Sequence, residues 1–191
     1  MRFSSFSALL LLAACAADRG APEAADASAA GWRIAPEGDL NSFFECLEER
    51  EVALVSAHRG GPRPGLPENA IETIAATLAA APALIEIDVA TSADGVLFLN
   101  HDDTLDRTTT GEGPVAEKTW AEISRLRLKD ETGAVTPYAP TLFSDALALT
   151  KDRTVLQVDF KRSTRYEDVI AEINRQGAED RVVLIAYTMA Q

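Results

Sequence analysis

Short apolar segments alternate with amphipathic segments along most of this chain. Five runs rich in Val, Ile and Leu lie at residues 52–57, 84–89, 96–99, 155–160 and 182–187. Most of them are almost continuously apolar, which is typical of strands covered on both faces in a parallel sheet. Helical spacing of apolar residues marks the segments between them, at residues 71–78, 141–149 and 166–174. Alternating strands and helices predict an α/β architecture.

Polar side chains that could act in catalysis or bind a metal ion lie at or near the carboxyl ends of four of these strands: His58, Glu86, Asp88, His101, Asp159 and Lys161. A closed barrel brings all of its strand ends around one mouth, whereas an open doubly wound sheet spreads them along an edge. We therefore predict a TIM-type (β/α)8 barrel. Eight strand–helix units usually need about 250 residues, but only about 140 follow the start of the first strand. We expect about the first five strands here, in a domain that is incomplete at its C-terminus.

The first residues resemble a bacterial export signal. Arg2 supplies a short positive start, and residues 9–12 end an apolar stretch that is too short to span a bilayer. Leu12-Ala13-Ala14-Cys15 is similar to the lipobox of bacterial lipoproteins, which implies cleavage before Cys15 and lipidation of its thiol. An ordinary signal peptide that contains a cysteine is the alternative.

The lipobox resemblance divides the chain into three parts. We expect a signal peptide at residues 1–14, then the lipidated cysteine and a flexible tether at residues 15–37, then the folded catalytic domain at residues 38–191. The tether is rich in Ala, Asp and Glu and has too few large apolar residues to offset the entropy of folding. The resemblance implies a location on the periplasmic side of the cell envelope, anchored in the outer membrane by lipid.

The balance of charge is acidic. Eighteen Lys and Arg residues stand against 30 Asp and Glu residues, which gives a net charge of −12. Such a surface repels nucleic acid, so we expect no DNA or RNA partner. An anionic phosphate substrate would need local positive charge from a metal ion or from Arg and Lys side chains.

The two histidines of the chain each follow a predicted strand. His58 opens the sequence His-Arg-Gly-Gly, and His101 opens His-Asp-Asp. Imidazole titrates near neutral pH, so it is the side chain most often used to move protons. Two histidines at matching positions predict an acid/base pair in preference to two structural residues. The sequence leaves open which of them is the acid and which is the base.

Glu86 and Asp88 stand two positions apart on the second predicted strand, so their side chains point to the same face and can share one cation. Their apolar neighbours predict a buried strand, where two unpaired carboxylates would be costly, and this disfavours a merely solvated face. Oxygen ligands favour Mg²⁺ or Ca²⁺ over zinc. Together with the two histidines, this pair predicts metal-assisted hydrolysis.

Several short motifs, taken in order, carry a resemblance to a known family. They are His58-Arg59-Gly60, Pro67-Glu68-Asn69-Ala70, Glu86-Ile87-Asp88, His101-Asp102 followed by Leu105-Asp106-Arg107-Thr108-Thr109, and Asp159-Phe160-Lys161. This series resembles the glycerophosphodiester phosphodiesterase family. Any one motif alone would be weak, but their order and spacing make the resemblance specific.

The resemblance implies a TIM-type barrel that hydrolyses small-molecule glycerophosphodiesters to an alcohol and glycerol 3-phosphate with one divalent cation. It implies acid/base roles for His58 and His101, and contacts from Arg59 and Lys161 to the substrate phosphate. It implies that Asp159 joins Glu86 and Asp88 as a metal ligand. Relatives often have Glu at this third position, so Asp159 is shorter by one methylene group.

The remaining polar residues of these motifs are interpreted as structural. We expect Glu68 to stabilise the start of the helix that follows it. Asp102, Asp103 and Asp106 are expected to fix the loop after His101 through turn and capping bonds, and residues 107–109 to support it.

Two other functions remain open at this point. One is a phospholipase D-like enzyme of the same fold that acts on lysophospholipid or sphingomyelin and releases a cyclic phosphate. The other is a catalytically inactive lipoprotein fragment that serves as a binding module. The products of hydrolysis separate the first of these from a glycerophosphodiesterase, and indifference to loss of both histidines identifies the second.

Overall fold

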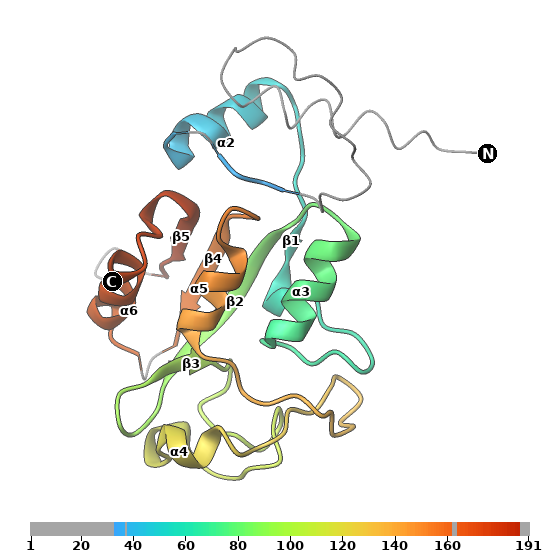
Figure 1. Ribbon diagram of the computed structural model, residues 1–191, viewed down its shortest axis with the longest axis vertical. Helices are drawn as coiled ribbons and strands as arrows, with labels where there is room; N and C mark the ends of the chain where they lie inside the picture. Colours follow the sequence, from blue (N-terminus) through green and yellow to red (C-terminus); the bar gives the residue numbers. More distant parts are fainter. Residues whose placement is uncertain (1–32, 37, 162–163, 188–191) are drawn as a thin grey trace, which may run out of the picture.

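The structure, a computed structural model, describes residues 33–36, 38–161 and 164–187 (Figure 1). The predicted signal peptide, the predicted lipidation site Cys15 and most of the predicted tether lie outside the described residues. Within the described part, no helix is both long enough and apolar enough to cross a membrane. Membrane anchoring therefore stays a prediction.

Four parallel strands form the centre of the molecule: β1 (Ser56–Ala57), β2 (Leu84–Thr91), β4 (Leu156–Phe160) and β5 (Val182–Ile185). They lie side by side in the order β1-β2-β4-β5, so that neighbours in the parallel sheet follow one another along the chain. Among the described residues the sheet does not close on itself. The predicted α/β architecture with a parallel sheet is confirmed.

The third predicted strand runs in the opposite direction to the others. β3 (Leu97–Leu99) pairs antiparallel with the end of β2, matching Thr91 with Leu97 and Val89 with Leu99. The reason is the short connection, because a parallel return needs a crossover of a dozen residues or more. β3 therefore leads the chain back beside Asp88, where the backbone N–H of Asn100 donates to its carbonyl oxygen over 3.1 Å.

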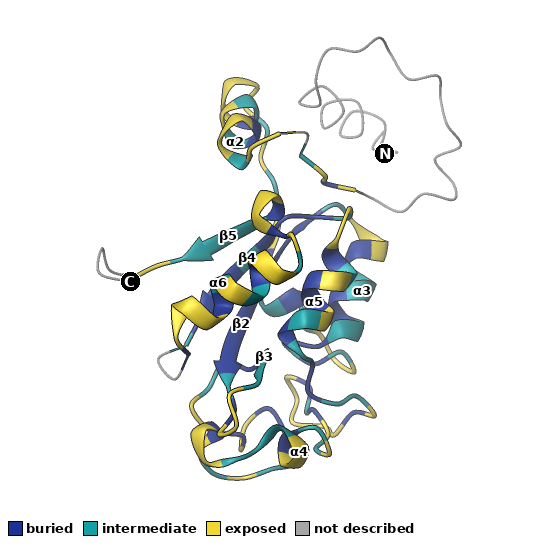
Figure 2. Cartoon of the chain, turned by 60° about the vertical axis from the view of Figure 1, so that its left-hand side comes forward, coloured by how far each residue is buried: buried dark blue, intermediate teal, exposed yellow. Residues whose placement is uncertain are grey.

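Three helices cover one face of the sheet, and they are α3 (Ile71–Ala80), α5 (Phe143–Thr150) and α6 (Tyr166–Arg175) (Figure 2). Alternate residues of β2 and β4 point into this helical layer, and they form the main core with Ile74, Leu78, Phe143, Leu147, Val169 and Ile173. The strand residues of that core are Ile85, Ile87, Val89, Leu156, Val158 and Phe160. Because side chains alternate along a strand, Glu86, Asp88 and Asp159 lie on the opposite face.

The amino ends of the strands are covered by α2 (Leu40–Glu49), which begins at an N-cap where Asp39 accepts a hydrogen bond from the backbone of Ser42. Phe43 and Leu47 of α2 are buried against Leu84 and Val155, at the amino ends of β2 and β4. β1 is shorter than the strand predicted at residues 52–57, and residues 52 and 54 pack against this second core. The loops that carry the candidate site residues therefore lie at the opposite, carboxyl ends of the strands.

The long segment after His101 has a small core of its own. It includes the 3-10 helix η3 (Val115–Glu117) and the short helix α4 (Trp120–Ile123). Leu105, Val115 and Ile123 are buried with Phe98 of β3, and the ring of Trp120 lies 5.7 Å from that of Phe98. This packing anchors the loop that carries His101 and Asp102 to the end of the β2–β3 hairpin.

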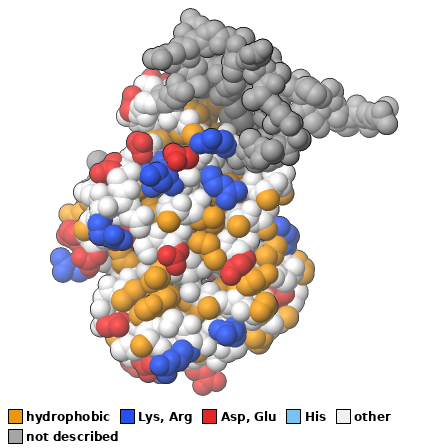
Figure 3. Space-filling view, in the orientation of Figure 1, with side chains coloured by type: hydrophobic (Ala, Val, Ile, Leu, Met, Phe, Trp, Pro, Cys, Tyr) orange, Lys and Arg blue, Asp and Glu red, His pale blue; other side chains and the backbone are white. Residues whose placement is uncertain are grey.

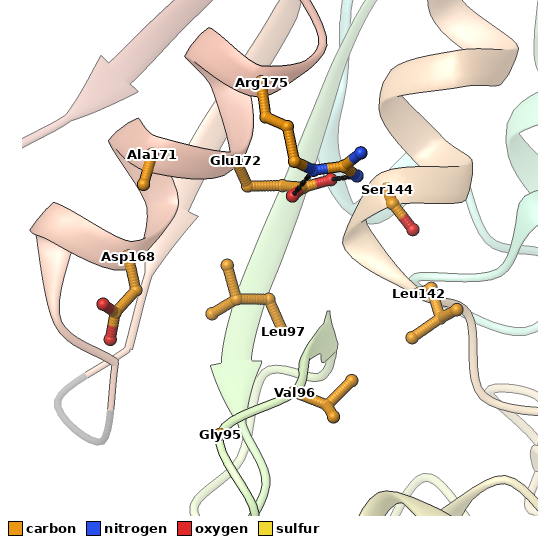
Figure 4. A pocket seen from close by; sticks show the side chains of 9 residues that line it. All are labelled: Gly95, Val96, Leu97, Leu142, Ser144, Asp168, Ala171, Glu172 and Arg175. Atoms are coloured by element: carbon orange, nitrogen blue, oxygen red, sulfur yellow. Dashed lines mark hydrogen bonds and ion pairs between the residues drawn. The ribbon is translucent and has the colours of Figure 1, made fainter.

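A groove of about 490 Å³ lies between β3, α5 and α6 (Figure 4). Its lining includes Leu97, Leu142 and Ser144, and the Glu172–Arg175 ion pair of α6 lies beside it. No predicted site residue lines this groove. On the face drawn in Figure 3, the described Asp and Glu side chains are interspersed with Lys and Arg.

Glycine substitutions in the turn after β1 test how closely this turn packs against α3. In the 3-10 helix η2 (His58–Gly60), Gly60 has φ +82°, and a Cβ atom there would lie 2.9 Å from Cγ1 of Ile74 in α3. Gly65 has a similar φ of +80° with no atom within 4 Å of such a Cβ. We predict that Gly65→Ala costs about 1 kcal/mol through backbone strain alone, and Gly60→Ala about 2–4 kcal/mol because overpacking adds to it. Urea denaturation measures both, and equal losses would contradict the close packing of this turn on α3.

Candidate functional site

Three buried carboxylates meet on the face of the sheet opposite the helices. Asp88 of β2 and Asp159 of β4 are paired in register, and Glu86 precedes Asp88 by two positions. One ligand oxygen from each of the three residues lies within 4.8 Å of the others. The exposed fractions are 8% for Glu86, 1% for Asp88 and 5% for Asp159. The structure therefore brings together the three residues that were predicted to bind a metal ion.

Two cationic side chains lie against these carboxylates. Nζ of Lys161 is 2.6 Å from Oδ1 of Asp88 and 2.6 Å from Oδ2 of Asp159. Nε of Arg59 is 3.4 Å from Oδ2 of Asp88. Burial disfavours the charged form of Lys161, but its hydrogen bonds to Asp159 and Asp88 outweigh this and raise its pKa. The two residues predicted to bind phosphate therefore lie at the same site, where they neutralise carboxylates.

The site carries more negative than positive charge. Three carboxylates face two cations, and burial together with the charges of Asp88 and Asp159 raises the pKa of Glu86, against the opposing effects of the Arg59 backbone N–H and of His58. The buried Oδ1 atom of Asp159 has no hydrogen-bond partner among the described residues. A hard divalent cation fits this set of oxygen donors, because Mg²⁺ and Ca²⁺ prefer carboxylate ligands.

His58 lies on the first side of this cluster. It follows β1 directly, at the level of Glu86 across the sheet, and its side chain is exposed. The next residue, Arg59, has a left-handed backbone with φ 53°, and its N–H donates to Oε2 of Glu86 over 2.7 Å. This hydrogen bond fixes the turn that carries His58 to the rim of the carboxylate cluster.

His101 lies on the second side, at the end of the β2–β3 hairpin. Its Nδ1 atom is 2.6 Å from Oδ1 of Asp102. The hydrogen bonds of Asp102 with Arg107 and His101 outweigh its partial burial and hold the pKa of that carboxyl at about 2. An ionised carboxylate only accepts hydrogen bonds, so Nδ1 of His101 carries a proton. Its Nε2 atom has no hydrogen bond to any residue in the described part of the chain.

Asn69 is a site residue that the sequence interpretation overlooked. Its Nδ2 donates to Oδ2 of Asp88 over 2.7 Å, and its Oδ1 accepts from the backbone N–H of Asp88 over 3.0 Å. The pairing of β1 with β2 ends at Ile85, three residues before Asp88, and the amide of Asn69 takes the place of a strand neighbour there. Asn69 has φ 56°, a conformation that Asn adopts more readily than most residues. Nothing in the letters Pro-Glu-Asn-Ala alone marks this positive φ.

The predicted role of Glu68 at a helix start is wrong. The helix α3 begins at Ile71, with Ala70 as its N-cap, so Glu68 lies outside its first turn. Its Oε1 atom instead accepts from Nη1 of Arg59 over 3.0 Å, and both of its oxygens accept from Arg107 over 2.8 Å. Glu68 therefore belongs to the site, as a partner of two arginines.

Comparison with known sequences identifies the relatives of the chain. Residues 58–189 match the Glycerophosphoryl diester phosphodiesterase family. A glycerophosphodiester phosphodiesterase of Caldanaerobacter subterraneus is 32% identical over 142 residues, which cover 70% of this chain and 58% of that protein. Glycerophosphodiester phosphodiesterase 1 of Bos taurus is 37% identical over 83 residues, covering 44% of this chain and 25% of that protein.

Comparison with solved structures gives the same relationship. A glycerophosphoryl diester phosphodiesterase from Parabacteroides distasonis superimposes with a TM-score of 0.66 at 40% sequence identity. The match covers 69% of this chain and 46% of that one. The chain thus spans between a quarter and three fifths of the length of these relatives.

The raised pKa of Glu86 gives a test of the carboxylate cluster without any added metal. A carboxyl whose pKa is higher in the folded than in the unfolded state destabilises the fold increasingly as the pH rises from its ordinary value of 4.5. We predict that Glu86→Gln raises the Tm at pH 7 in EDTA, and that the gain disappears below pH 4.5. The exposed Glu131→Gln is the matched control, with no change expected. A lower Tm for Glu86→Gln at pH 7 would contradict the crowding of negative charge.

Proposed function

Because the chain belongs to the glycerophosphoryl diester phosphodiesterase family, we propose that it hydrolyses glycerophosphodiesters to an alcohol and glycerol 3-phosphate. The proposal includes one divalent cation, Mg²⁺ or Ca²⁺, held by Glu86, Asp88 and Asp159. The observation that carries it is the convergence of these buried carboxylates within 4.8 Å. The backbone of the residue next to each histidine, Arg59 and Asn100, is hydrogen-bonded to Glu86 and Asp88 respectively. The chain spans only part of its relatives' length, so the experiments below measure the activity on this chain itself.

The roles of the charged residues follow from their positions. A divalent cation at the three carboxylates would supply charge stabilisation for the phosphate oxygens in the transition state. Arg59 and Lys161 lie at the same cluster with side chains that are 17% and 16% exposed, so each can also reach an anionic phosphate. Nε of Arg59 is buried and forms no hydrogen bond among the described residues, and its ion pair with Oδ2 of Asp88 spans 3.4 Å, so it can still donate to such a ligand.

The roles of the histidines follow from their two loops. His58 and His101 are proposed as the two groups that transfer protons. One takes the proton of the glycerol hydroxyl group that attacks phosphorus, the other donates a proton to the leaving alcohol oxygen, and a water molecule then opens the resulting cyclic phosphate to glycerol 3-phosphate. Asp102 holds Nδ1 of His101, so Nε2 is the atom of His101 that exchanges a proton with the substrate. His58 is exposed beside Glu86 and is accessible from solvent.

Metal binding is tested by thermal melts in excess Mg²⁺ or Ca²⁺ against EDTA. We predict that a saturating cation raises the Tm of the parent chain, since a ligand at 100 times its Kd stabilises the fold by ~2.7 kcal/mol. Asp159→Asn should lose most of this rise, because it removes one ligand charge and leaves the fold intact. Asp145→Asn, an exposed position at the start of α5, is the matched control and should keep the full rise. Equal rises in both variants would contradict the assigned ligands.

Hydrolysis is tested with glycerophosphocholine. We predict release of glycerol 3-phosphate, with kcat lowered about 10²- to 10⁴-fold in His58→Ala and in His101→Ala. The melts described above act as the control, since both variants should keep the metal-induced rise in Tm. A cyclic phosphate as product would support the phospholipase D-like alternative instead. Turnover that is indifferent to both histidines would contradict the proposed acid/base pair.

A further inference from the structure

Arg107, in the loop after His101, forms an unusually rich set of ion pairs for a half-exposed side chain. Its Nη1 and Nη2 atoms each donate to one oxygen of Glu68 over 2.8 Å. Its Nε and Nη2 atoms donate to the two oxygens of Asp102 over 2.6 and 2.9 Å. One guanidinium group thus holds two carboxylates from loops that lie far apart in the sequence.

Each of these two carboxylates has a second partner in the candidate site. Glu68 accepts a hydrogen bond from Nη1 of Arg59. Nε of the same arginine forms an ion pair with Oδ2 of Asp88 over 3.4 Å. Asp102 accepts from Nδ1 of His101. A continuous series of ion pairs therefore runs from Asp88, a predicted metal ligand, through Arg59, Glu68 and Arg107 to Asp102, and a hydrogen bond extends it to His101. Arg107 lies at its centre.

We propose that Arg107 is a positioning residue for the phosphodiesterase reaction, which fixes the phosphate-binding Arg59 and the proton-transferring His101 relative to each other through Glu68 and Asp102. This inference rests on the proposed function. Arg107 itself does not need to touch the substrate. It acts through the two carboxylates that orient the residues in contact with substrate.

The geometry requires arginine at this position. A planar guanidinium group can form a two-pronged pair with each of two carboxylates at once. The ammonium group of lysine can contact two carboxylates, as Lys161 does, but only through a single nitrogen atom, so it cannot reproduce both forks. Both carboxylates are charged at neutral pH, because hydrogen bonds and the charge of Arg107 outweigh burial and lower the pKa of Glu68, as they do for Asp102. They therefore only accept hydrogen bonds, and each turns its oxygens towards the arginine donors.

Stability alone does not account for this bridge. The side chain of Arg107 is 50% exposed, so solvent screens its ion pairs and limits what they contribute to stability to on the order of 1 kcal/mol each. The loop is also fixed by other contacts, since Oγ1 of Thr108 donates to Oδ1 of Asn100 over 3.1 Å and Leu105 is buried in the small core. Loss of Arg107 would therefore release Glu68 and Asp102 while the loop itself stays folded.

The test compares kcat, KM and Tm of Arg107→Met and Arg107→Lys with the parent chain on glycerophosphocholine. We expect Arg107→Met to lower kcat about 10- to 100-fold, because small misplacements of reacting groups have effects of this size. Arg107→Lys should recover little of the loss, and the Tm should change only slightly. Arg175→Met is the matched control, because it removes a two-pronged arginine–glutamate pair on α6 whose arginine side chain is 65% exposed, and it should leave kcat unchanged.

A double variant with His101→Ala distinguishes a positioning role of Arg107 from a general structural effect. In the His101→Ala background, we expect Arg107→Met to lower kcat by only a few-fold. An equal loss in both backgrounds would overturn the proposal, as would full recovery by Arg107→Lys. A parent chain that does not hydrolyse glycerophosphocholine would overturn the proposed function and this role with it. An active parent whose kcat is unchanged by Arg107→Met would overturn the role of Arg107 alone.

Discussion

The concentration of negative charge on β2 and β4 is the constraint on which the site depends. Three carboxylates with exposed fractions of 8% or less would be costly to bury without positive partners. Lys161, Arg59 and the amide of Asn69 supply partners, and each of these residues stands directly after a strand or in the turns between β1 and α3. The requirement to neutralise this charge therefore dictates how the surrounding loops fold.

The sheet makes this arrangement possible by its register. Pairing Asp88 with Asp159 on adjacent parallel strands sets their side chains side by side on one face. The opposite face is filled by aliphatic side chains from α3, α5 and α6, so that the strands are held rigidly. The antiparallel β3 then returns His101 to the level of Asp88, where a parallel strand could not have delivered it after so short a connection.

Much of this could be predicted from the sequence, because it depends on simple periodicity. The two-residue spacing of Glu86 and Asp88 shows a shared face, and continuous apolar runs show buried strands. The direction of β3 follows from loop length, which the interpretation of five equivalent strands did not use.

The roles of Asn69, Glu68 and Arg107 could not be predicted. Each depends on contacts between loops that are distant in sequence and, for Asn69, on a positive φ. The sequence places Glu68 at a helix start because Pro67 and Glu68 are residue types that a helix start favours, but α3 begins only at Ile71. Local patterns do not distinguish a capping carboxylate from one that binds two arginines.

Equilibrium dialysis of the parent chain against Ca²⁺ or Mg²⁺ tests the charge of the site most directly. We predict one tightly bound ion per chain, lost in Asp88→Asn and retained in the exposed control Asp145→Asn. A chain that binds no ion, or that binds it equally well without the carboxylate of Asp88, would contradict the assignment of Glu86, Asp88 and Asp159 as a metal centre.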